Sequence, residues 1–426
     1  MINEIIIHVG MHKTGSSSIQ ETFSNIPMEE VEYLSLGSSN HSGFFSTLLS
    51  KKPENYHTHR RNGLNKTQVR ELQQSYMEKL HTVLQGVTKK IALISAEDLS
   101  SSSNEYSELE YLKDILSPYC RRIRLIGYVR PPAGYMQSAF QQRMKSGGKK
   151  IFDLEKVYPY YQKSFMKMDA IFGKENVEFI LFSRDSLHGG DVVQDFASRI
   201  GVTVAPSKIV RTNESLSLEA TALLFVFRCY GGALEGYKGY NRDNNLLLAV
   251  LKRIGNKKLV FSEAALMPVF EANHNDIEWM SQRLGSSILE ESDNSLQTIA
   301  NEQDLLNVAY ENRLAIWSLL EQEEALSRSS EGLAKLVDRL YILHAKDNPP
   351  LQLPEYSLFN PAQLESIATS NNEPVNVLKI LADALEKNGQ QAVAQSVRQS
   401  KKKASRLIGE SSGMQAANNK HSDLRK

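Results

Sequence analysis

Residues 8–20, HVGMHKTGSSSIQ, have the composition of a loop that binds an anion. Gly10 and Gly15 have the spacing of a Walker A loop, in which a lysine and a serine or threonine follow the second glycine. Here a run of serines starting at Ser16 follows it, and the lysine lies earlier, at Lys13. Backbone N–H groups, hydroxyls and one ammonium can hold an anion in such a loop. An ordinary strand-to-helix turn with a serine cap would also explain Gly15 and Ser16.

A second stretch, LIGYVRPPAGYMQSAFQQRMKSG, places an arginine and a serine where they can reach one phosphate. Arg130 follows an apolar run, and Ser138 comes eight residues later in a segment with helical spacing. An arginine at the carboxyl end of a strand and a serine in the next helix can converge in the crevice outside a sheet. The alternative is a strand-end charge in solvent and a neutral helix position.

The elements that must position these residues alternate between strands and helices as far as about residue 210. Such an order predicts an α/β fold with a parallel sheet between two layers of helices, followed by additional C-terminal helices. The apolar runs read as buried strands at 4–9, 90–95, 122–129 and 177–182. The segments with helical spacing are 16–25, 66–86, 105–118, 132–145 and 190–200.

The composition of the chain changes towards its C-terminus, which predicts four parts. The boundary near 345 rests on KDNPPLQLPEYSLFNP, since proline lacks a donor and restricts its neighbours. The predicted parts are an α/β domain at 1–290, a helical extension at 291–345, a proline-rich linker at 346–361, and a short helical segment with a basic, disordered tail at 362–426.

Composition excludes several classes of protein. The 426 residues include 50 basic and 49 acidic side chains, whereas nucleic-acid-binding proteins usually carry a clear positive excess. Two cysteines, Cys120 and Cys229, make neither a disulfide framework nor a metal cluster, which favours a reducing compartment. The chain shows no signal peptide and no apolar stretch of membrane-spanning length. We therefore expect a cytoplasmic protein with no bound metal and no nucleic-acid partner.

The two motifs together resemble those of sulfotransferases that use 3'-phosphoadenosine 5'-phosphosulfate (PAPS), in particular bacterial carbohydrate sulfotransferase-like proteins. GMHKTGSSSIQ is similar to the family's 5'-phosphosulfate loop, in which the lysine precedes the glycine, and YVRPPAGYMQSAF is similar to its 3'-phosphate motif. LISAEDLS, RTNESLSLEA and EANHNDIEWMSQRLG extend the resemblance over about residues 1–290. It implies a P-loop fold and transfer of a sulfuryl group from PAPS to a hydroxyl, of a carbohydrate or glycan.

The resemblance also implies which residues contact the donor. Sulfuryl transfer needs positioning and charge stabilisation of the leaving group, and Lys13 would be catalytic by neutralising the phosphate oxygens. Arg130 and Ser138 would hold the 3'-phosphate, while Arg211 and Asn213 replace a family stretch that has no clear counterpart here. The 5' group would be held by Lys13, Thr14, Gly15, Ser16, Ser17 and Ser18.

A base must take the proton of the acceptor hydroxyl, and two residues compete for this role. His41 lies where related proteins often carry a histidine near the acceptor, and Glu97 follows a predicted buried strand. A histidine in a surface loop and a carboxylate at a helix start are equally good readings. His41 is slightly preferred, because a neutral imidazole is a base near pH 7 whereas Glu97 would need a raised pKa.

Other features leave alternatives open. Gln142, Arg143 and Lys145 would meet an anionic acceptor or simply form a solvated helix face. The basic stretch RQSKKKASR and the C-terminal helices would contact a membrane surface or an acidic protein, or remain solvated. Rival functions are a P-loop nucleotide kinase or NTPase, which the missing Lys-Ser pair disfavours, and an inactive sulfotransferase-like binding module.

Overall fold

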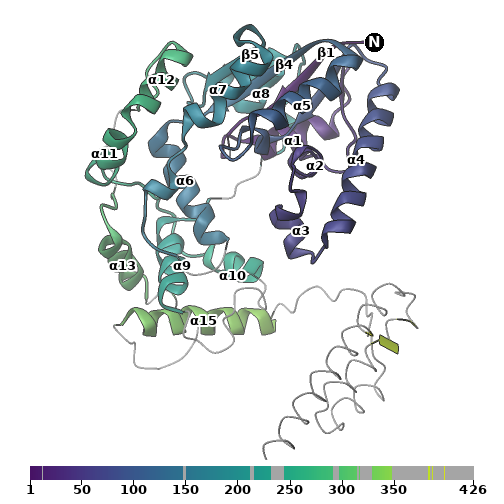
Figure 1. Cartoon of the computed structure of the whole chain (residues 1–426). Helices are drawn as coiled ribbons and strands as arrows, with labels where there is room; N and C mark the ends of the chain where they lie inside the picture. The colour runs from purple at the N-terminus through teal and green to yellow at the C-terminus, as the bar shows by residue number, and fades with distance from the viewer. Residues whose placement is uncertain are drawn as a thin grey trace, which may run out of the picture. The chain divides into compact units, whose positions relative to one another are not determined.

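The computed structural model describes residues 1–11, 13–146, 150–211, 215–231, 244–290, 297–313, 316, 329–347, 382–383, 386 and 398. The chain divides into two units, Met1–His344 and Ala345–Lys426 (Figure 1). Almost all of the second unit lies outside the described residues, as do nearly all of the predicted linker and C-terminal segment. The fold and the candidate site therefore concern the first unit.

The first unit contains a five-stranded sheet in which every pairing is parallel, with the order β2-β3-β1-β4-β5. This confirms the predicted α/β class. The strands are β1 (Ile2–His8), β2 (Val31–Tyr33), β3 (Ile91–Ser95), β4 (Cys120–Val129) and β5 (Val177–Leu181). The sequence analysis missed β2, because a strand of three residues is too short to show a period.

The central strand β1 is buried on both faces, as expected for a parallel sheet covered by helices on both sides. Ile5, Ile6 and Ile7 have no exposed surface. In the register of the sheet, His8 pairs with Ser95 of β3 and with Ile126 of β4. The segments that follow β1, β3 and β4 consequently leave the sheet at one edge, next to one another.

Helices cover both faces of the sheet (Figure 1). On one face, α1 (Ser16–Asn25) contacts α8 (Val192–Arg199), and their apolar residues form a core with Ile6 and other alternate strand residues. On the other face, α5 (Tyr106–Leu116) contacts α7 (Tyr161–Phe172), and each also contacts a strand. Successive strand residues point to opposite faces, so one apolar run supplies both cores.

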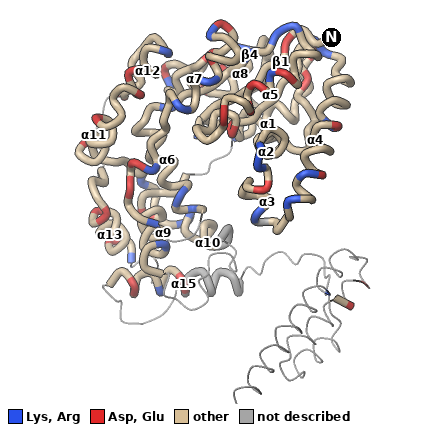
Figure 2. The backbone as a smooth tube through the Cα atoms, in the orientation of Figure 1, with Lys and Arg blue, Asp and Glu red and all other residues tan. Residues whose placement is uncertain are grey.

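The remaining helices lie around this sandwich, where α2 contacts α4, and α9 contacts α6, α10 and α13. Their bounds are α2 (Ser42–Leu49), α3 (His57–Arg61), α4 (Lys66–Gly86), α6 (Pro132–Lys145), α9 (Leu218–Tyr230), α10 (Asn244–Leu251), α11 (Glu263–Ala272), α12 (His274–Leu284), α13 (Glu302–Glu311) and α15 (Ser330–Asp347) (Figure 1). Acidic and basic residues are interspersed along the described chain (Figure 2).

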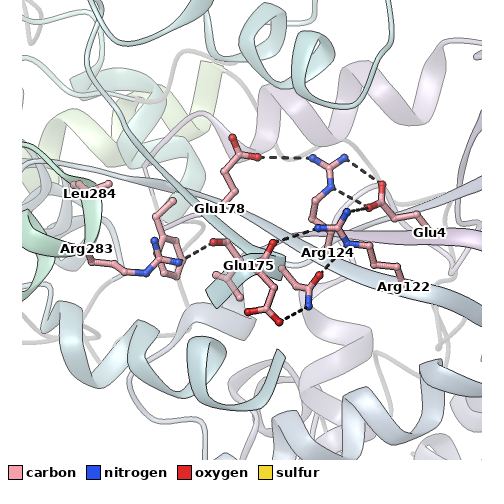
Figure 3. Close-up of a pocket in the computed structure, with 10 residues that line it drawn as sticks. Glu4, Arg122, Arg124, Glu175, Glu178, Arg283 and Leu284 are labelled. Carbon is pink, nitrogen blue, oxygen red and sulfur yellow. Dashed lines mark hydrogen bonds and ion pairs between the residues drawn. The ribbon is translucent and has the colours of Figure 1, made fainter. Parts of the chain in front are cut away.

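Ion pairs link the amino ends of the strands (Figure 3). Arg124 of β4 donates from Nε and Nη2 to the two oxygens of Glu4 of β1, at 3.2 Å each. Its Nη1 lies 3.7 Å from Glu178 of β5, and Arg122 donates to the amide oxygen of Asn176 at 2.9 Å. These contacts join three adjacent strands at the edge of the sheet opposite to the segments that follow them.

A buried ion pair fastens α12 to the sheet. Arg283 donates to both oxygens of Asp169 on α7 at 2.7 and 2.9 Å, and to the carbonyl of Val177 at 2.8 Å. The guanidinium also lies over the ring of Phe179, 4.8 Å from its centroid. Only 6% of the Asp169 side chain is exposed, so the carboxylate depends on this partner for its charge.

Candidate functional site

A cleft of about 960 Å³ opens at the carboxyl ends of the strands. It receives residues from the segments after β1, β3 and β4, which is where ligands bind in open α/β sheets. The predicted site residues that line it are Lys13, Gly15, Ser16, Ser17, Glu97, Arg130 and Ser138. Those that do not are Thr14, Ser18, His41 and Arg211.

The loop after β1 has an unusual backbone. Gly15 has φ 77° and precedes α1, and a Cβ added to it would lie 2.7 Å from Cγ1 of Val192. Lys13 has φ 70°, and among the described residues Tyr160 is the other non-glycine residue with positive φ. Such a conformation costs of order 1–3 kcal/mol and is concentrated at functional sites. The loop is therefore held in a strained shape that directs its backbone into the cleft.

The first turn of α1 carries hydrogen-bond donors towards an anion. No side chain caps this helix and no acidic residue lies in its first turn. Ser16 is 3% exposed, and its Oγ has no hydrogen-bond partner in the described structure. A buried hydroxyl without a partner is unfavourable unless a ligand or water completes it. Thr14, by contrast, is occupied within the loop, since its hydroxyl donates to the carbonyl of Met11 at 2.7 Å.

Arg130 joins the two sequence motifs. Its Nη1 donates both to the carbonyl of Lys13, at 2.8 Å, and to Oγ of Ser138, at 2.7 Å. Its own carbonyl accepts from the hydroxyl of Tyr161 at 2.7 Å. Burial lowers the pKa of the Arg130 guanidinium, but arginine keeps its charge in proteins. A permanent positive charge thus lies between the loop and α6.

The segment after β3 contributes carboxylates to the cleft. Glu97 begins a 3₁₀ turn, Glu97–Ser100, and accepts from Nδ2 of Asn40 at 3.3 Å. The backbone N–H of the next residue, Asp98, donates to Oγ of Ser42 at 3.1 Å. Both carboxylates line the cleft, so either lies on the side where a proton acceptor is needed.

The structure does not support the preference for His41 over Glu97. The His41 side chain is fully buried and bridges to β3, where Nδ1 accepts from the backbone N–H of Ser95 at 3.1 Å. Burial lowers its pKa to about 4, so the ring is neutral but a weak base. The sequence could not show that this residue faces inward, and the polar residue beside it, Asn40, faces the cleft.

Arg211 does not approach the 3'-phosphate motif. It is exposed and forms an ion pair at 2.9 Å with Asp191, the residue that caps α8. Asn213 lies outside the described residues. The guess that these two residues replace the family's missing basic stretch therefore gains no support from the position of Arg211.

Sequence reasoning missed two aromatic residues on the segment before α3. Tyr56 and His57 both line the cleft, and their ring centroids are 4.5 Å apart. Burial and the neighbouring charge of Asp98 raise the pKa of Tyr56 to about 12, so it stays protonated. Only tertiary packing brings this segment to the cleft, and the sequence carries no periodic signal for it.

Two further searches concern only the described part of the chain. No group of three or more histidine, cysteine, aspartate or glutamate side chains there is arranged to hold a metal ion. No helix among the same residues has the length and apolar character needed to cross a membrane.

Comparisons with known proteins give a structural likeness at low similarity. No family model and no curated protein matches the chain. A sulfotransferase from Alicyclobacillus acidocaldarius is 19% identical with a TM-score of 0.32, over 53% of this chain and 91% of that one. The sulfotransferase domain of the curacin biosynthetic pathway is 13% identical, with a TM-score of 0.29, over 50% and 79%. The sulfotransferase domain of the Synechococcus PCC 7002 olefin synthase is 12% identical, with a TM-score of 0.30, over 72% and 94%. At these values the activity must be inferred from the cleft itself.

Proposed function

We propose that the protein is a sulfotransferase that moves a sulfuryl group from PAPS to a hydroxyl of a carbohydrate or glycan. The observation that carries this proposal is the position of Arg130, whose guanidinium bonds both to the carbonyl of Lys13 and to Ser138. It brings a 5'-anion loop and a 3'-phosphate motif into one cleft. A nucleotide with phosphates at both positions has the matching chemistry.

The residues of the cleft fit this donor. Ser16 presents an unpartnered buried hydroxyl beside the uncapped start of α1, which suits the 5' group. At the other motif, Ser138 accepts from Arg130, so its own proton remains to be donated to a phosphate oxygen. A 3'-phosphate is what distinguishes PAPS from ATP, and the Arg130–Ser138 pair is the feature that selects it.

The roles of the side chains follow from their charges. PAPS supplies the sulfuryl group when bound. Lys13 lowers the energy of the negative charge that grows on the leaving phosphate, while Arg130 fixes the loop that carries Lys13. Glu97 is placed to take the proton of the acceptor hydroxyl.

The role of Glu97 can be tested by Glu97→Gln. Because the amide cannot accept the proton, we expect kcat to fall at least about 100-fold, the lower end of general-base contributions. Affinity for the spent donor, 3',5'-adenosine bisphosphate (PAP), should stay unchanged, because Glu97 does not belong to either anion motif. Unchanged kcat in this variant would remove Glu97 from the mechanism.

One observation favours the kinase alternative. Glu97 and Asp98 follow β3, the strand beside β1, and both line the cleft near the loop. Carboxylates next to a phosphate loop can hold Mg²⁺. The sequence order of Lys13 and Ser16 nevertheless departs from the Lys-Ser/Thr pair of that class.

A thermal-shift titration with PAP, 5'-AMP and Mg-ATP tests the proposal, since a ligand that binds only the native state raises the melting temperature. Selective stabilisation by PAP is the expected result, and stabilisation by Mg-ATP alone would favour the kinase. A binding module would respond to PAP as well. Sulfate transfer from PAPS to a panel of oligosaccharides separates the enzyme from that module.

A further inference from the structure

One face of α6 extends the cleft well beyond the 3'-phosphate motif. Tyr135, Ser138, Gln142 and Lys145 recur at intervals of three and four residues, so they lie along one stripe of the helix, and all of them line the cleft. The opposite stripe is the core face, with Met136, Phe140 and Met144 at most 1% exposed.

The end of this stripe is basic. Lys145 comes seven residues after Ser138, which is roughly 10 Å along the helix axis at 1.5 Å per residue. Arg143 lines the cleft beside it, and both side chains are half-buried. Figure 2 shows basic positions near the end of α6 that lies away from the sheet. A ligand that fills the cleft therefore reaches a second cationic region.

Positive charges are close enough in this region to affect one another. Burial lowers the pKa of Lys150, and the nearby charges of Arg143 and Arg228 lower it further. Lys156 also lines the cleft and forms an ion pair with Asp153 at 2.9 Å. The donor motifs already contain Lys13 and Arg130, so these other cations serve a different part of the ligand.

We infer that the acceptor is anionic and that Arg143 and Lys145 bind its carboxylate, sulfate or phosphate group. This inference rests on the proposed function and adds the substrate class to it. A half-buried arginine in a cleft suits an oxyanion, because its planar fork can donate two parallel hydrogen bonds. Basic residues in the last turn also stabilise α6 through the helix dipole, which is the competing explanation.

Binding of two oligosaccharides to the PAP-saturated protein tests this inference. The probes are a chondroitin hexasaccharide and its desulfated, carboxyl-reduced counterpart, measured by calorimetry at low salt. We expect the anionic probe to bind at least about tenfold more tightly, the effect of one hydrogen bond to a charged group. The double variant Arg143→Gln, Lys145→Gln should lose this preference and still bind PAP.

Lys163→Gln is the matched control, since Lys163 is exposed on α7 and does not line the cleft. It should keep the preference for the anionic probe. Equal affinity for the two probes, or a preference retained in the double variant, overturns the inference while leaving PAP binding and the proposed function in place. Failure of the wild-type protein to bind PAP overturns both.

Discussion

Ser138→Ala is the most direct probe of how the cleft selects a 3'-phosphate. Arg130 is a less direct one, because its Nη1 also holds the carbonyl of Lys13. Its removal would disturb the 5' loop as well as the 3' motif. Ser138 contacts Arg130 through its Oγ at 2.7 Å, and its loss leaves the bond from Arg130 to the loop in place. We therefore expect the serine variant to affect only one end of the nucleotide.

The size of the effect follows from the hydrogen bond that is removed. A bond between a hydroxyl and a charged phosphate contributes about 1.5–3 kcal/mol, which is about 10- to 150-fold in Kd. The affinity for PAP should fall by this factor in Ser138→Ala. The affinity for 5'-AMP, which has no 3'-phosphate, should change by less than about threefold because the 5' loop is intact.

Isothermal titration calorimetry of both nucleotides on both proteins measures this difference. Ser117→Ala is the control, because Ser117 is an exposed serine in the turn before β4 and bonds only locally, to the carbonyl of Lys113. It should bind both nucleotides like the wild type. Equal weakening of PAP and 5'-AMP by Ser138→Ala would refute the assignment of this serine to the 3'-phosphate.

Three further changes test the loop, the core and the pH response. Gly15→Ala forces a Cβ to within 2.7 Å of Val192 at φ 77°, so it should destabilise the fold by about 1–3 kcal/mol in urea unfolding and weaken PAP. Arg283→Ala strands the buried carboxylate of Asp169 and should cost about 3–5 kcal/mol in the same assay, with PAP affinity unchanged. The pKa of His41 is about 4 in the folded protein against 6.5 unfolded, so the unfolded state binds more protons between these values. The unfolding free energy should therefore fall as pH drops from 6.5 towards 4, and His41→Gln should flatten this dependence.

Each of these predictions has an outcome that contradicts it. Normal stability of Gly15→Ala would mean that the loop relaxes away from Val192. A loss below about 1 kcal/mol in Arg283→Ala would mean that water reaches Asp169. An unchanged pH slope in His41→Gln would show that His41 is accessible to protons in the folded state.

The sequence predicted the sheet well because its strands are long apolar runs, as in IIIH before the loop and RLIGYV before Arg130. The helix 16–25 was predicted at the bounds that the structure gives, and 132–145 likewise. The short strand β2 and the helix α7 were missed, since neither stands out from its surroundings in composition. Local pattern therefore fixed most elements of the sheet region but not all of them.

The candidate site was predictable only where a motif follows a strand. Ser16 and Arg130 were found in this way, because a parallel sheet places such residues at one edge. His41 was misjudged, since the direction of a loop side chain depends on packing. His57 reaches the cleft through tertiary contacts that no local pattern records, so it was missed.

The ion pairs of Figure 3 lie at one end of the sheet and the cleft at the other. Glu4, Arg122 and Arg124 belong to strands whose far ends carry the loop and Arg130. Heat tolerance and turnover can consequently be engineered on separate sets of positions within the same strands. A library confined to the salt-linked end could raise the working temperature of a biocatalyst while the residues that meet its substrates keep their native identities.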